Sequence, residues 1–189
     1  NEWAAGIYTT STEGPIFITN VKGGFGKKDS ARQTAYHEYT HHLISMYSNV
    51  IFPTWYNEGM AEYLSTFEAS NKGVVKLGLP SNGRAYALAN KNWIDMPVIL
   101  NSVKKYPFKY TSDKSNTAIS QFYAQSWLAT HYIQSTEGYS AKLKTYLEYV
   151  NSETYLTGVF EKSFGLSPEA FEVDLRKYYK KNRYPGLRI

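Results

Sequence analysis

Residues 30–48, SARQTAYHEYTHHLISMYS, decide the fold of this chain because they contain His37-Glu38-Tyr39-Thr40-His41, the pattern H-E-x-x-H. Ser30 and Gln33 form a capping box, which predicts a helix from here to about residue 48. Side chains four residues apart share one face of a helix, so the two imidazoles can bind one metal ion. Glu38 then lies beside that ion, where a carboxylate can accept a proton from water.

The composition supports a metal site of this kind. With 4 His among 189 residues, chance alone gives this pattern in about one chain in two hundred of the same composition. The chain has no Cys, which excludes thiolate ligands, a cysteine nucleophile and a disulfide framework. Any metal site must therefore use His, Asp and Glu. The simpler alternative is a solvated His-rich turn, since His42 directly follows His41.

A third ligand is needed, because a catalytic zinc site takes three protein ligands and leaves one position open. Glu58 is the natural candidate, since a short loop through Pro53 lets two predicted helices pack antiparallel with opposed faces. Glu62 lies one turn further along the same face. We expect Glu62 to accept the second N–H of a zinc-bound histidine and so fix its protonation state. The alternatives are that Glu62 is the ligand in place of Glu58, or an acid on the helix surface. We expect one Zn²⁺ per chain.

The rest of the sequence predicts an α+β domain. Residues 7–21 are rich in β-branched and aromatic residues and predict two short strands or a hairpin, followed by a loop over 22–26. Residues 73–79 predict a lone strand, with a polar loop through 82–83. Further helices are expected at about 54–64, 96–104, 117–135, 139–151, 154–163 and 167–182. We expect an N-terminal lobe over 1–50 and a helical lobe over 51–189, which together form one catalytic domain.

The chain resembles a known group of enzymes at two motifs. His37-Glu38-x-x-His41 followed by Trp55-Tyr56-Asn57-Glu58-Gly59-Met60-Ala61 is similar to the gluzincin zinc metallopeptidases, and in particular to the peptidase MA-like domains related to aminopeptidase N and thermolysin. The resemblance implies a zincin-like fold with Glu58 as the third zinc ligand. It also implies hydrolysis of peptide bonds by a zinc-activated water, with Glu38 as the general base.

Two weaker similarities concern the substrate. Residues 122–129, FYAQSWLA, resemble the helix on which aminopeptidase-like members carry a tyrosine that stabilises the oxyanion, which places that role on Tyr123. The alternatives for this role are Tyr110, His131 and Tyr132. The family also binds the substrate backbone as an added strand upstream of the zinc helix, and the corresponding residues here are Ile16, Phe17, Ile18 and Thr19.

The segment upstream of the zinc helix also indicates whether the enzyme would cleave at a chain end or within a chain. Aminopeptidase-like members carry a Glu there that captures the free amino terminus, whereas the only nearby acid in this chain is Glu13. We therefore expect an endopeptidase that acts on peptide or protein substrates. Proteins of this resemblance are often exported, so an extracytoplasmic or secreted location is expected.

Two other classes of protein stay open at this point. One is a non-catalytic peptide-binding or scaffold domain that keeps the zincin fold without turnover. The other is a binder of anionic polymers, suggested by the net charge of +5 and by the basic residues Arg176, Lys177, Lys180, Lys181, Arg183 and Arg188. Such a run is more often the solvated face of a terminal helix, so no nucleic-acid partner is expected. No apolar stretch is long enough to span a bilayer, and further domains outside this chain are left open.

Overall fold

The computed structural model describes residues 6–19, 28–90, 92–103, 105–107, 113–152, 158–181, 184 and 187–188. It is mostly helical with two small antiparallel sheets, which is an α+β arrangement. The helices are α1 (Lys28–Tyr47), α2 (Thr54–Ser65), α3 (Asn82–Ala89), α4 (Met96–Leu100), α5 (Asp113–Ser135), α6 (Tyr139–Asn151), α7 (Val159–Phe164) and α8 (Pro168–Lys180). The strands are β1 (Gly6–Ser11), β2 (Gly14–Thr19), β3 (Glu68–Ala69), β4 (Val75–Leu77) and β5 (Leu187–Arg188).

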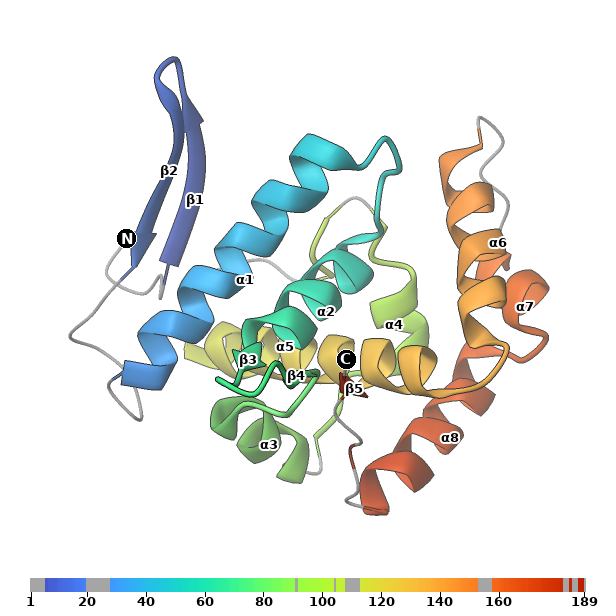
Figure 1. Ribbon diagram of the computed structural model, residues 1–189. Helices are drawn as coiled ribbons and strands as arrows, with labels where there is room; N and C mark the ends of the chain where they lie inside the picture. The colour runs from blue at the N-terminus through green and yellow to red at the C-terminus, as the bar shows by residue number, and fades with distance from the viewer. Residues whose placement is uncertain are drawn as a thin grey trace.

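The first sheet is a hairpin of β1 and β2, which confirms the prediction for residues 7–21. It lies beside α1 at one end of the molecule, while α6, α7 and α8 lie at the other end (Figure 1). The ring of Phe17 on β2 contacts the rings of Tyr39 and His42 on α1, at centroid distances of 6.0 and 5.8 Å. This aromatic contact attaches the hairpin to the helix that carries H-E-x-x-H. The predicted loop over 22–26 lies outside the described residues.

Helices α1 and α2 pack against each other in antiparallel fashion. His37 on α1 contacts Glu62 on α2, and His41, one turn later on α1, contacts Glu58, one turn earlier on α2. The predicted antiparallel pair is therefore confirmed. The helix begins at Lys28, two residues before the predicted start, so that Ser30 lies within it.

Helix α5 crosses the middle of the molecule against α2 (Figure 1). Gly59 permits this close approach, because a Cβ at this position would collide with Thr130 Oγ1 and with the backbone carbonyl of Ser126. Much of the buried core lies on α5 and on the helices around it. Its largest fully buried side chains are Trp55, Trp127, Tyr146, Phe122, Phe164, Phe171, Met96, Ile99, Leu128, Ile133, Leu175 and His131.

We expect Gly59→Ala to destabilise the protein, because the added methyl group must push α2 away from α5. Overpacking of this kind costs about 1–3 kcal/mol of unfolding free energy. Gly83→Ala is the matched control, since Gly83 is also helical and a Cβ there meets nothing within 4 Å. The control should leave stability unchanged or raise it by up to about 1 kcal/mol. Urea unfolding of both variants measures the difference, and equal stabilities would contradict the close-packing account.

The segment between α2 and α4 differs from the prediction. Residues 82–83 begin helix α3 instead of a loop, because the Ser81 side chain accepts a hydrogen bond from the Arg84 backbone N–H at 3.4 Å and caps the helix. The strand predicted at 73–79 is shorter, and it is not alone, since β4 pairs with both β3 and β5.

Other predicted bounds also shift. The helix expected at 96–104 ends at Leu100, and the one expected at 117–135 begins at Asp113. The helix expected at 154–163 begins at Val159, with 153–157 outside the described residues. The helix expected at 139–151 is confirmed, and the last helix covers Pro168–Lys180.

Part of the basic charge near the C-terminus is paired within α8. Arg176 lies 2.7 Å from Glu172, and Lys177 lies 3.2 Å from Asp174. These pairs are those of a solvated helix face, as the sequence predicts for this region. None of the described helices combines the length and the apolar character that crossing a membrane requires.

His131 is a core residue. Its side chain is fully buried on α5, and the hydroxyls of Tyr178 and Ser135 lie 2.8 and 3.2 Å from its Nδ1. Burial lowers the pKa of His131 from 6.5 to about 4. The alternative that His131 stabilises an oxyanion is therefore wrong, because a ring with no exposed surface cannot reach a substrate.

This buried histidine predicts acid sensitivity. As the pH falls below 6.5, His131 becomes protonated in the unfolded chain. In the folded chain the same side chain stays neutral until the pH reaches about 4. The contribution to stability is thus complete above pH 6.5 and is lost as the pH falls toward 4, by about 3 kcal/mol in total. His131→Gln removes the titration, so its unfolding free energy should depend less on pH across this window. Urea unfolding at pH 4–7 compares the two proteins, and parallel curves would contradict the prediction.

Candidate metal centre

Three side chains on α1 and α2 converge on one point. His37 Nε2 and His41 Nε2 lie 3.1 Å apart, and Glu58 Oε2 lies 3.2 Å from the first and 3.3 Å from the second. The two histidines are half-buried and Glu58 is buried. Together they form a group that could hold a metal ion.

The spacing of these atoms fits zinc. Ligands held at about 2.0–2.1 Å in a tetrahedron lie about 3.3–3.4 Å from one another, close to the three distances observed. Glu58 Oε2 is buried, yet it accepts no hydrogen bond from any described residue. A buried carboxylate oxygen without a donor is costly unless a cation satisfies it. Two neutral imidazoles and one carboxylate also form a donor set suited to Zn²⁺.

Glu62 occupies the position behind His37. Its Oε1 lies 3.2 Å from His37 Nδ1, the ring nitrogen that faces away from the ligand group. A carboxylate in this position fixes which ring nitrogen carries the proton, and leaves Nε2 free to bind a metal. Glu62 is itself held by Arg84 of α3, which donates two hydrogen bonds at 2.8 and 2.6 Å. Glu62 is therefore neither a surface acid nor a member of the converging ligand group.

The electrostatics of the site favour a cation. Burial alone would lower the pKa of His37, but the nearby carboxylates of Glu58 and Glu62 raise it to about 10. Burial would raise the pKa of Glu58, but the two histidines lower it to about 2. Burial would also raise the pKa of Glu62, but Arg84 and His37 hold it well below its usual range. Both carboxylates are thus ionised at neutral pH, and without a metal His37 is protonated between them; a metal ion would take the place of that proton.

Two tyrosines extend the site on its α5 side. Tyr106 donates a hydrogen bond to Glu58 Oε1 at 2.6 Å, and its hydroxyl lies 3.2 Å from that of Tyr123 on α5. The Tyr123 ring packs edge-on to the ring of His37 at 5.9 Å, and the Arg84 guanidinium lies 4.9 Å from its centroid. The predicted oxyanion residue Tyr123 therefore lies beside the group that could hold a metal ion. Of the alternatives, Tyr132 packs against the rings of Tyr139, Phe171 and Tyr178, and Tyr110 lies outside the described residues.

Glu38 is half-buried on α1. Within the described part of the chain it makes no hydrogen bond or ion pair, so its carboxylate is not committed to a structural contact there. On the helix it lies between the stripe of His37 and His41, which faces α2, and the stripe of Tyr39 and His42, which faces the hairpin. Glu38 therefore borders the space between the ligand group and the hairpin.

The predicted substrate strand is β2. Ile16, Phe17 and Ile18 are partly exposed, by 43%, 37% and 55%, and Thr19 is the last residue of the strand. Among the described residues β2 pairs only with β1, so one of its edges has no strand partner there. Because successive side chains of a strand alternate, Phe17 faces α1 and the two isoleucines face away from it. Binding of a substrate backbone at this strand stays a prediction.

Sequence reasoning missed two residues of the site, Arg84 and Tyr106. Arg84 belongs to helix α3, which the sequence analysis does not predict, and it is 22 residues from its partner Glu62. Tyr106 is one of 18 tyrosines, and it is 48 residues from Glu58. No spacing rule connects either residue to its partner, so only the tertiary structure could find them.

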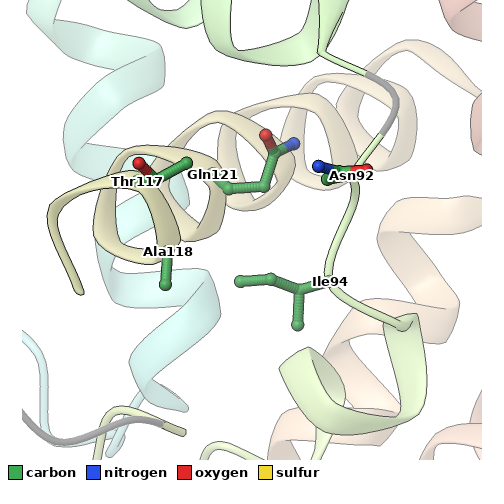
Figure 2. A pocket seen from close by; sticks show the side chains of 5 residues that line it. All are labelled: Asn92, Ile94, Thr117, Ala118 and Gln121. Atoms are coloured by element: carbon green, nitrogen blue, oxygen red, sulfur yellow. The ribbon is translucent and has the colours of Figure 1, made fainter. Parts of the chain in front are cut away.

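A separate hollow lies on another side of α5. Its volume is about 310 Å³, and Figure 2 shows Thr117, Ala118 and Gln121 of α5 facing Asn92 and Ile94 of the segment between α3 and α4. Gln121 and Tyr123 are two residues apart on α5, which turns their side chains by about 200° relative to each other. The hollow is therefore not part of the metal centre.

Comparisons of the chain with protein-family models, with curated proteins and with solved structures found no match. A function must therefore be argued from the site itself.

The ligand assignment predicts unequal effects of two matched substitutions on α2. Glu58→Gln should weaken zinc binding by more than about 100-fold, because it removes an anionic ligand. Glu62→Gln should cost about 10–100-fold, because it disturbs only the orientation of His37. Both residues are buried carboxylates one turn apart, so each controls for the loss of buried charge in the other. Competition with a chromophoric chelator measures both affinities, and equal losses would overturn the assignment.

Proposed function

We propose that this chain is a zinc-dependent endopeptidase with a zincin-like fold, similar to the gluzincin metallopeptidases. The observation that supports it most strongly is the convergence of His37 Nε2, His41 Nε2 and Glu58 Oε2 at 3.1–3.3 Å, with a buried oxygen that lacks a donor among the described residues. The likeness at the two motifs adds the expectation of peptide hydrolysis. Peptides or unfolded protein segments are the proposed substrates, in keeping with an exported protein.

In the proposed mechanism one set of residues binds the metal and a second set positions a ligand. His37, His41 and Glu58 hold the metal, and Glu62 and Arg84 hold His37 in the orientation and protonation state that binding requires. When bound, zinc supplies Lewis acidity, which lowers the pKa of water and polarises a carbonyl group.

Glu38 takes the proton of the attacking water and delivers it to the leaving amine. A carboxylate suits this role when no structural contact already occupies it, and none is formed by Glu38 within the described residues. The hydroxyl of Tyr123 donates to the oxygen on which negative charge develops. This donor is worth most in the transition state, where the oxygen carries its charge.

In this proposal the substrate lies along the edge of β2 that has no strand partner among the described residues. Its backbone pairs with β2 in extended form, which requires main-chain groups but no free terminus. The segment from Gly14 to Thr19 contains no acid that could capture an amino terminus. An internal peptide bond is therefore the expected point of cleavage.

Glu38→Gln separates hydrolysis from metal binding. The variant should fold normally and keep one zinc per chain, because Glu38 is outside the ligand group, while hydrolysis falls by about 10²–10⁴-fold. Metal content by mass spectrometry and cleavage of a peptide blocked at its N-terminus give the two readouts.

Three outcomes would count against the proposal. Loss of zinc from Glu38→Gln would make Glu38 a ligand instead of a base. Strict dependence of wild-type cleavage on a free amino terminus would overturn the endopeptidase assignment. Zinc binding without any hydrolysis by the wild type would favour a non-catalytic peptide-binding domain.

A further inference from the structure

Tyr106 contacts the proposed metal ligand Glu58 from outside the two ligand helices. It lies in the segment after α4, half-buried, with its ring edge-on to the buried ring of Phe122 at 5.6 Å. Its hydroxyl donates to Glu58 Oε1 at 2.6 Å, a short hydrogen bond to a charged acceptor. The Tyr123 hydroxyl is 3.2 Å away, so Tyr106 connects the ligand to the residue proposed to contact substrate.

The two oxygens of Glu58 therefore face different partners. Oε1 is occupied by Tyr106, whereas Oε2 faces both imidazoles and accepts no hydrogen bond from a described residue. Oε2 is thus the oxygen that faces the metal position, while Oε1 is held by Tyr106.

We propose that Tyr106 is a positioning residue that holds Glu58 as a one-oxygen metal ligand. A carboxylate that bound through both oxygens would fill the coordination position that a hydrolytic zinc site keeps for water and substrate. By occupying Oε1, Tyr106 keeps that position open. This inference rests on the proposed function, since it concerns the same metal site.

The test uses cobalt(II), which replaces zinc in such sites and reports coordination number through its visible absorption. Wild-type protein loaded with cobalt should show the intense bands of a four-coordinate site. Tyr106→Phe keeps the ring and its packing but frees Oε1, so the bands should weaken toward those of a five-coordinate site. Zinc affinity, measured by chelator competition, should fall by about 10–100-fold.

Tyr178→Phe is the matched control. It also removes one phenol hydroxyl from a buried hydrogen bond, the one to His131 Nδ1 at 2.8 Å, but it does so in the core instead of at the ligands. This variant should keep the wild-type cobalt spectrum and zinc affinity. Thermal unfolding followed by circular dichroism checks that both variants are folded.

The outcomes separate the inference from the proposed function. Wild-type spectrum and affinity in a folded Tyr106→Phe would overturn the positioning role and leave the peptidase proposal intact. A five-coordinate spectrum in the wild type would also overturn the positioning role, even if Tyr106→Phe failed to fold. A wild type that binds neither cobalt nor zinc would overturn both.

Discussion

The contact between α1 and α2 is the constraint on which the rest of the site depends. Its antiparallel register sets His41 against Glu58 and His37 against Glu62. A shift of one residue would turn each side chain by about 100° and separate the ligand atoms. Gly59 fixes the register further, because it lets α2 lie directly on α5 while Glu58 points to α1. Two neighbouring residues of α2 thus serve different needs: Gly59 allows close packing in the core, and Glu58 reaches the histidines of α1.

Charge balance is the second requirement, because two buried carboxylates face two histidines across this contact. Arg84 neutralises Glu62 through two hydrogen bonds, and it does so from α3, outside the helix pair. Glu58 has no arginine or lysine partner among the described residues, and it is left with Tyr106 and the two imidazoles. The carboxylate without an arginine or lysine partner is therefore that of Glu58, whose oxygen lies in the candidate ligand group, as a cation site requires.

The sequence predicts those features of the fold and the site that depend on residues close together in the chain. The i, i+4 spacing of His37 and His41 and the short connection through Pro53 suffice to predict the helix pair and its opposed faces. The start of α3 was misread because Asn82-Gly83 is typical of a turn, while its single capping residue, Ser81, is a weak signal. The roles of Arg84 and Tyr106 could not be predicted, because they depend on tertiary contacts with residues far away in the sequence.

We propose that His37, His41 and Glu58 hold one zinc ion, and anomalous diffraction at the zinc edge from crystals of the zinc-loaded protein would locate that ion. We expect one strong peak per chain, bounded by His37 Nε2, His41 Nε2 and Glu58 Oε2, with Glu62 still paired to Arg84. A peak coordinated by Glu62 with Arg84 displaced would contradict the ligand assignment. The absence of any peak at these three side chains would contradict the claim itself.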